Sequence, residues 1–221
     1  MKKLLILIIC LISLSLISTV SAHQPRLIVD KASSANAPIL IEEPEISKAY
    51  YAQLEQFNEY YGINSTKEFE LYLSLQVPDI AAQSTNTSLE LTDDSGLQLA
   101  YLNGSQHRWE KFHEDFGNAN YLSGPSIHVA LPPGSYVIKI SGEENTKYVL
   151  VSGQKEEFPA SEFLNSLFLV PKINQEFFGM NLFQSLANVF GILLLVIFSL
   201  IGFVILVLIK KSVRTSTKNK S

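Results

Sequence analysis

The most informative stretch of the chain reads FELYLSLQV, from Phe69 to Val77. Apolar side chains fill every second position, and most of the positions between them are polar. Because successive side chains of a strand point to opposite faces of a sheet, this alternation is typical of a strand with one buried face. Pro78 follows directly and ends the pattern, since proline has no amide hydrogen to give to a sheet. The stretch therefore predicts a half-buried β-strand.

Short patterns of the same kind recur towards the C-terminus. Residues 88–92 and 97–102 flank Asp93-Asp94-Ser95-Gly96, whose composition is typical of a hairpin turn. Turn residues also separate three further apolar or alternating segments, which are 127–131, 136–140 and 148–151. Several short strands joined by turns predict a mainly β ectodomain, an antiparallel β-sandwich or jelly roll, over residues 45–158.

The start of this ectodomain fits two structures. Ile46, Ala49, Tyr50 and Leu54 have the spacing of a buried helix face, but residues 45–63 also fit two strands joined around 56–59. We favour two strands, because the strands that follow need pairing partners. Residues 23–44 are polar and rich in small side chains, and we expect them to form a lead-in segment before the sandwich.

Two apolar segments predict the topology of the chain. Residues 1–22 combine a short basic start, an apolar core and Val20-Ser21-Ala22, which is typical of a secretory signal peptide cleaved after Ala22. The alternative is an uncleaved N-terminal anchor. Residues 189–209 carry no charge, and a helix of that length is about 31 Å long, near the thickness of the bilayer hydrocarbon. We expect this second segment to be a transmembrane helix.

The C-terminal tail, residues 210–221, is basic and contains no acidic residue. Positive charges accumulate on the cytoplasmic side of membrane helices, so the tail is expected in the cytoplasm, with Lys210, Lys211 and Arg214 flanking the membrane. The chain is thus predicted to be a single-pass type I protein of the cytoplasmic membrane with its ectodomain outside. The short Met-Lys-Lys start and the scarcity of cysteine favour a bacterial cell envelope.

Residues 159–188 join the predicted sandwich to the membrane helix. Phe163, Leu164, Leu167 and Phe168 have helical spacing, and Pro171 is expected to break or kink that helix. We interpret the segment as an amphipathic stalk that lies on the sandwich or on the membrane surface. Packing against the ectodomain's own core is the alternative.

Four motifs carry a resemblance to a known family. They are Asn58-Glu59-Tyr60-Tyr61, the alternating strand Phe69 to Val77, Gly134-Ser135-Tyr136 and Tyr148-Val149-Leu150. With these motifs, residues 45–151 resemble the bacterial pre-peptidase C-terminal domain. The resemblance implies a jelly-roll fold and a non-catalytic accessory role, with calcium or carbohydrate binding in some members. The chain departs from the family pattern because a predicted membrane anchor follows the module.

Composition and motifs exclude several function classes. The net charge of −4 comes without a basic cluster outside the tail, so nucleic-acid binding is not expected. The single cysteine, Cys10, cannot form an internal disulfide or a site with several thiolates. Because no Gly-x-Ser-x-Gly, His-Glu-x-x-His or P-loop motif occurs, we expect no enzyme activity. The sequence carries no signal for an oligomeric state.

The densest polar and aromatic cluster spans residues 107–116. Its simplest interpretation is a long loop between strands whose aromatic side chains cover one end of the sandwich. Alternatively, the cluster is a ligand surface that includes His113, in which Trp109 provides a stacking platform and Glu110 and Asp115 accept hydrogen bonds from the hydroxyl groups of a sugar. These four residues are the candidate ligand-binding residues.

Metal binding is not expected, but two clusters are candidates. His107 and His113, together with Glu110, Glu114 or Asp115, are residue types that bind zinc, although their spacing matches no zinc signature. Asp93 and Asp94 carry oxygen ligands of the kind that calcium prefers. A turn with two carboxylates is more commonly only a turn, so we expect no cofactor and keep calcium as the alternative.

Three functions follow from these observations. The first is a non-catalytic, membrane-anchored β-sandwich that binds a protein or glycan partner outside the cytoplasm or supports an envelope complex. The second is a metal-dependent hydrolase that uses the histidines and acids of residues 107–115. The third is an architectural spacer. We favour the first, because the chain has an anchor segment and lacks a catalytic motif.

Overall fold

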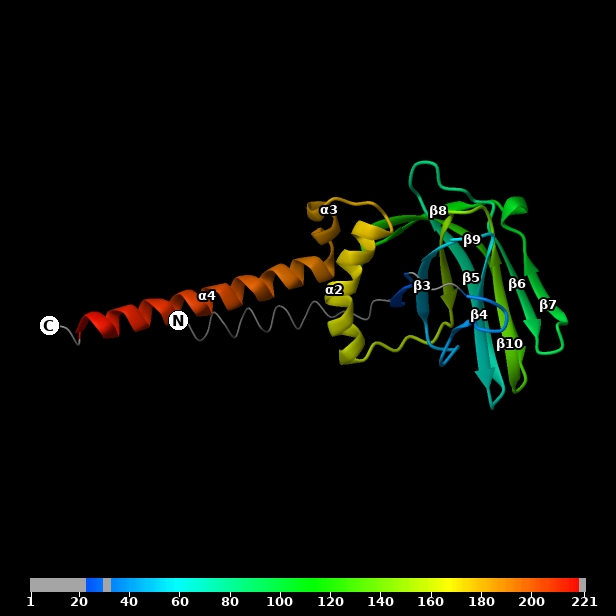
Figure 1. The fold of residues 1–221 in the computed structure, drawn as a ribbon, viewed down its shortest axis with the longest axis horizontal. Coiled ribbons are helices and arrows are strands. Elements are labelled where there is room, and N and C mark those ends of the chain that lie inside the picture. Colours follow the sequence, from blue (N-terminus) through cyan, green and yellow to red (C-terminus); the bar gives the residue numbers. More distant parts are fainter. Residues whose placement is uncertain (1–22, 30–32, 219–221) are drawn as a thin grey trace.

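The computed structural model describes residues 23–29 and 33–218, with side chains described as far as Lys210. The predicted signal peptide and its cleavage site lie outside the described residues. Two β-sheets stack face to face, and helices α2, α3 and α4 follow them along the chain (Figure 1). The fold is therefore mainly β, as predicted.

The first sheet has six strands in the order β1-β3-β11-β5-β9-β8. Their bounds, in that order, are Gln24–Leu27, Lys48–Gln53, Lys147–Ser152, Phe69–Pro78, Ala119–Leu131 and Glu110–Glu114. The second sheet has five strands in the order β2-β4-β10-β6-β7. Their bounds are Ile39–Leu40, Asn58–Ser65, Gly134–Ser141, Ser88–Asp93 and Gln98–Leu102, and the short 3-10 helix η1 spans Gly104–Gln106.

The inner faces of the two sheets form one core. The alternating side chains of β5 are buried in it, and Leu71, Leu73 and Leu75 have no accessible surface. Ile138 and Ile140 of β10 meet them from the second sheet. Burial of this kind stabilises a fold by roughly 25 cal/mol per Å² of apolar surface. The predicted β-sandwich is confirmed, and so are the two strands within residues 45–63, which are β3 and β4.

The predicted lead-in segment is wrong in one respect, because it supplies two strands of the sandwich. β1 pairs with β3 and β2 pairs with β4, and both pairs are parallel. The sandwich is therefore not purely antiparallel. Both strands lie at the edge of a sheet and contain only four and two residues, too few to show a period of two in the sequence.

The segment 107–116 is also more regular than the predicted long loop. Residues Glu110–Glu114 form β8, which pairs with β9 at the edge of the first sheet. Charged side chains are common on edge strands, where they discourage pairing with other chains. The charge mixture that suggested a loop is thus compatible with an exposed edge strand.

A polar network links the two sheets inside the core. The Tyr148 hydroxyl group from β11 donates to the carboxylate of Glu59 on β4, and the hydroxyl oxygens of Tyr61 and Tyr148 are 2.9 Å apart. All three side chains are buried. Desolvation raises the pKa of Glu59, against the opposing effect of the hydrogen bond from Tyr148. Each member of the network therefore depends on the others for its hydrogen bonds.

Helix α2 (Ala160–Glu176) covers the outer face of the first sheet. Ile173, Phe177 and Phe178 pack against Ala49, Val149, Val151 and other residues of that face. In addition, the guanidinium group of Arg26 on β1 makes two hydrogen bonds of 2.8 Å to the Glu162 carboxylate. Of the two predicted effects of Pro171, the break is wrong, because α2 continues through this residue. Packing on both sides of the helix offsets the hydrogen bond that proline cannot donate.

Helices α3 (Leu182–Leu186) and α4 (Val189–Lys218) complete the described chain. Residues Val189–Lys210 of α4 are long and apolar enough to cross a membrane. The predicted tail from residue 210 onward instead begins as a continuation of this helix, through Lys218. The side chains of Lys211 and Arg214 are beyond the described side chains. Phe190, Leu193 and Ile197 of α4 pack with Leu167 and Val170 of α2, so α4 is in direct contact with the helix that covers the first sheet.

Candidate functional site

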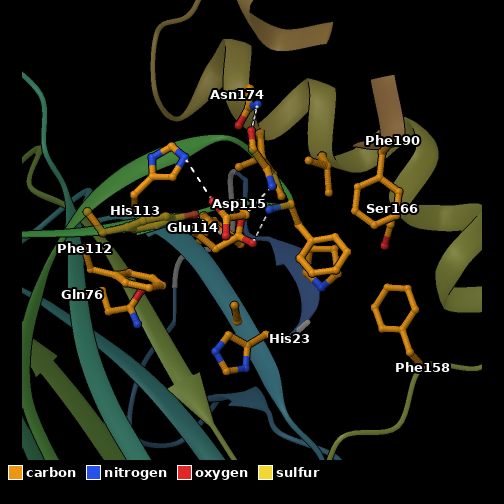
Figure 2. A pocket seen from close by; sticks show the side chains of 18 residues that line it. His23, Gln76, Phe112, His113, Glu114, Asp115, Phe158, Ser166, Asn174 and Phe190 are labelled. Atoms are coloured by element: carbon orange, nitrogen blue, oxygen red, sulfur yellow. Dashed lines mark hydrogen bonds and ion pairs between the residues drawn. The ribbon is translucent and has the colours of Figure 1, made fainter. Parts of the chain in front are cut away.

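A cavity of about 350 Å³ lies between α2 and the outer face of the first sheet (Figure 2). Pockets for small ligands typically have volumes of roughly 300 to 1,000 Å³. The lining is mainly aromatic and aliphatic, and Phe112, Phe116, Phe158 and Phe190 all contribute to it. The arrangement is suited to holding an apolar or aromatic group.

Two tyrosines form part of the sheet side of the cavity. The hydroxyl oxygens of Tyr51 on β3 and Tyr121 on β9 are 3.0 Å apart, so one hydroxyl group donates a hydrogen bond to the other. Burial raises the pKa of both side chains. They therefore remain neutral, and the sheet side of the cavity carries no charge from them.

The turn after β8 closes one side of the cavity, and Glu114 organises it. The two carboxylate oxygens of Glu114 each accept a 2.7 Å hydrogen bond, from the backbone amides of Phe116 and Gly117. Burial raises the pKa of Glu114, and the two backbone hydrogen bonds oppose that shift. The carboxylate is thus engaged by the turn itself.

The same turn is attached to the helices. Asn174 of α2 donates a 2.7 Å hydrogen bond to the carbonyl group of Gly117. Asn118 donates a 2.8 Å hydrogen bond to the carbonyl group of Ala187, just before α4. The turn 114–118 therefore connects the sandwich to α2 and to the start of α4.

Two of the four predicted ligand-binding residues line this cavity. The His113 ring donates a 2.8 Å hydrogen bond from Nδ1 to the side-chain oxygen of Asn120, and its other nitrogen, Nε2, lies 3.7 Å from the Asp115 carboxylate. Both side chains are exposed, and Figure 2 shows them pointing toward one another beside the cavity. His23 also lines the cavity, and desolvation lowers its pKa although the residue keeps an exposed surface. These groups provide a polar rim around an apolar interior.

The other two predicted residues are not part of the cavity lining. Trp109 packs against the main core, and its indole nitrogen donates a 2.8 Å hydrogen bond to the carbonyl group of Gly104. Its ring lies so close to Gly124 that a Cβ atom there would approach it to 2.6 Å. Glu110 is exposed on β8. Trp109, the predicted stacking platform, thus contributes mainly to the packing of the core.

Replacing Trp109 by phenylalanine is expected to lower the free energy of unfolding by about 1.5 kcal/mol, because the hydrogen bond to Gly104 is lost while most of the ring packing remains. Urea unfolding of the full chain in mild detergent, followed by circular dichroism, measures this change. Glu110→Ala is the matched control and should change stability by less than about 0.5 kcal/mol. An unchanged midpoint for Trp109→Phe would contradict the structural role.

The candidate metal residues do not converge. Within the described residues, no group of three or more histidine, cysteine, aspartate or glutamate side chains has the geometry to hold a metal ion. His107 lies beside the Trp109 ring and outside the cavity lining. Asp93 accepts hydrogen bonds from Ser95 and Leu97 within its own turn, and the bond from the Ser95 side chain is the main cause of its lowered pKa.

One hydroxyl group in the cavity lining comes from a serine of α2. Ser166, the hydroxyl-bearing serine in the lining, donates its hydrogen bond to the carbonyl group of Glu162 one turn earlier in α2, at 2.8 Å. Hydroxyl groups engaged in this way within a helix are not activated nucleophiles. The His113 and Asp115 pair thus has no partner nucleophile among the residues that line the cavity.

The sequence analysis missed the cavity itself and the roles of Glu114 and Asn174. Glu114 appeared only as one of several candidate metal ligands. The available signal was the sequence Glu114-Asp115-Phe116-Gly117, in which an acid precedes a turn glycine by three residues. Asn174 gave no signal, because its partner lies 57 residues away in the sequence.

Comparisons with known proteins give similarity in fold only. No family model matches the chain, and no curated protein matches it. Among solved structures, the chain is similar to the pre-peptidase C-terminal domain of a collagenase from Bacillus anthracis, with 12% identity, a TM-score of 0.34, and coverage of 56% of this chain and 98% of that one.

Two further solved structures are similar at lower scores. A β-glucosidase from Paenibacillus barengoltzii shows 11% identity and a TM-score of 0.25 over 61% of this chain and 14% of that one. CorA, a surface-associated copper-binding protein of Methylomicrobium album BG8, shows 11% identity and a TM-score of 0.19 over 64% of this chain and 88% of that one. Because all three TM-scores are low, we assign the β-sandwich from the strand pairing of this chain alone.

Proposed function

We propose that this protein is a non-catalytic binding module, anchored in the cytoplasmic membrane by α4, that binds a protein or glycan partner outside the cytoplasm. The main support is that a hydrogen bond connects the turn beside the cavity to the chain just before α4. Residues 114–117 form one wall of the cavity, and the side-chain amide of the adjacent Asn118 donates a hydrogen bond to the carbonyl group of Ala187, two residues before α4 begins. The binding face is thus held at a fixed place beside the membrane helix.

The sequence features support the same proposal. A signal peptide over residues 1–22 would export the sandwich, which we propose to be of the jelly-roll type, and the basic residues after position 209 would keep the C-terminus in the cytoplasm. The described basic side chain there is Lys210. A bacterial envelope is the proposed location.

The face around β8 is the proposed contact surface. Phe112 is 44% exposed and lies on the cavity side of β8, next to His113 and the exposed carboxylate of Asp115. An exposed aromatic side chain surrounded by polar groups is typical of the centre of a recognition surface. An apolar group of a partner would enter the cavity, while the polar rim would fix its orientation.

Photocrosslinking in membranes tests this proposal. With p-benzoylphenylalanine in place of Phe112, we expect a single discrete protein adduct if the partner is a protein. The matched control is the same substitution at Tyr101, which is 52% exposed on the edge strand of the opposite sheet, and it should give no adduct.

A glycan partner gives a different result. The purified full chain should then bind a defined set of sugars on a glycan array, and Phe112→Ser should reduce binding at least tenfold while Tyr101→Ser leaves it unchanged. The proposal is contradicted if the array is blank and position 112 gives no more adduct than position 101.

A further inference from the structure

Helices α2 and α3 carry an unusual set of exposed apolar side chains. Phe183 is 86% exposed, and Phe168, Leu164 and Leu182 are 61%, 59% and 57% exposed. They lie on the two helices that come directly before α4 (Figure 1). Large exposed apolar side chains in one region mark a surface that contacts another apolar medium.

The position of α2 along α4 indicates that this apolar medium is a lipid bilayer. A helix over Val189–Lys210 is about 33 Å long, while the hydrocarbon layer is about 30 Å thick. Nearly all of this stretch is therefore needed to cross a bilayer. Because α2 packs against Phe190, Leu193 and Ile197, its contacts lie within the first nine residues of the stretch. A bilayer spanned by α4 thus reaches the depth of α2.

The orientation of α2 points its exposed apolar residues away from the sandwich. Ile173 packs towards the first sheet. Leu164 precedes Ile173 by nine residues, about two and a half turns of an α-helix, so it projects from the opposite side. Phe168 lies one turn after Leu164 on the same face. Figure 1 shows α2 lying between the sandwich and α4, as this arrangement requires.

One further exposed residue of this face, Lys172, is suited to a membrane surface. Lys172 continues the row of Leu164 and Phe168 by one more turn and is exposed. Long basic side chains in such positions reach the headgroup layer while their methylene groups contact apolar surface. In α3, the capping interactions of Asn181 and Gln184 satisfy backbone groups at the start of the helix and leave Leu182 and Phe183 free to project outward.

We infer that α2 and α3 form a second membrane contact, in which Leu164, Phe168, Leu182 and Phe183 enter the interfacial region of the outer leaflet beside α4. The partner is the lipid surface. The inference rests on the proposed membrane anchoring by α4 and goes beyond it, because a simple anchor would leave α2 in water. Amphipathic helices bind membranes in this way, parallel to the surface and immersed by about 5–10 Å.

Depth-dependent fluorescence quenching tests the inference with the full chain in liposomes. Phe168→Trp and Phe183→Trp place a probe on each helix, Leu200→Trp places one in the middle of α4, and Tyr101→Trp is the control on the opposite sheet. Trp109 remains in every variant, so the wild-type protein supplies the baseline. Lipids brominated close to the headgroup or deep in the acyl chain quench probes at the corresponding depth.

The expected result is at least a twofold loss of the added emission for Phe168→Trp and Phe183→Trp with shallow bromines, and no loss for Tyr101→Trp. The Leu200→Trp variant should be quenched most by deep bromines. Quenching of that variant alone would overturn the inference and leave the anchor intact. Conversely, absence of quenching at position 200 would overturn the proposed anchor, and the two helix probes would still decide whether α2 and α3 meet lipid.

Discussion

Gly104→Ala is expected to destabilise the sandwich by at least about 3 kcal/mol, because the new methyl group has no space. A Cβ atom at this position would lie 1.9 Å from the carbonyl oxygen of Thr87 and 3.1 Å from that of Thr85. Both contacts are to backbone atoms, which cannot rotate away as a side chain does. The Gly104 carbonyl also accepts the hydrogen bond from Trp109, so the displacement would disturb that ring.

Urea unfolding of the full chain in mild detergent, followed by the fluorescence of Trp109, measures this effect. Gly134→Ala is the matched control, since the nearest atom to its added Cβ is the Tyr136 hydroxyl oxygen at 3.4 Å, an ordinary contact. It should change the free energy of unfolding by less than about 1 kcal/mol. Equal stabilities of the two variants would show that the chain around η1 is less closely packed than described.

Tyr148→Phe is expected to lower the free energy of unfolding by about 3 kcal/mol, because it leaves the buried carboxyl group of Glu59 without its donor. Tyr61→Phe is the control. It removes a neighbouring hydroxyl group but keeps the bond between Tyr148 and Glu59, so a loss of about 1 kcal/mol is expected. If both variants lost the same small amount, Glu59 would have another partner.

The same network predicts a dependence of stability on pH. Burial raises the pKa of Glu59 above 4.5, so the folded state keeps this proton to a higher pH than the unfolded state does. The contribution of Glu59 to stability is therefore largest below about pH 4.5 and is lost as the pH rises through the raised pKa. In Glu59→Gln, stability should fall less over this range than in the wild-type protein. A parallel fall in both proteins would contradict the assignment.

The sequence was sufficient for the elements whose side chains alternate. The strand at Phe69 to Val77 appears almost unchanged as β5, since each alternate residue enters the core. The edge strands β1 and β2 could not be found in this way, because their pairing with β3 and β4 is set by distant residues and each is too short for periodicity. Tertiary contacts likewise decided that α2 continues through Pro171.

The candidate site was predicted only in part, for the same reason. Residues 107–116 form a dense polar and aromatic cluster in the sequence, and of the four residues chosen from it only His113 and Asp115 line the cavity. The opposite wall comes from α2, more than 50 residues later in the chain. A cavity between two elements depends on how they dock, which single-sequence periodicity does not describe.

The short connections around the helices limit where this protein can act. Only two residues, Ala187 and Asn188, separate α3 from α4, and the amide group of Asn118 bonds the carbonyl group of Ala187 to the sandwich. With α4 in a bilayer, as proposed, the ectodomain has no tether that would let it swing or extend. The ectodomain then extends from the lipid by no more than the length of the sandwich. A partner must therefore come to the membrane surface or be embedded in the membrane beside the protein.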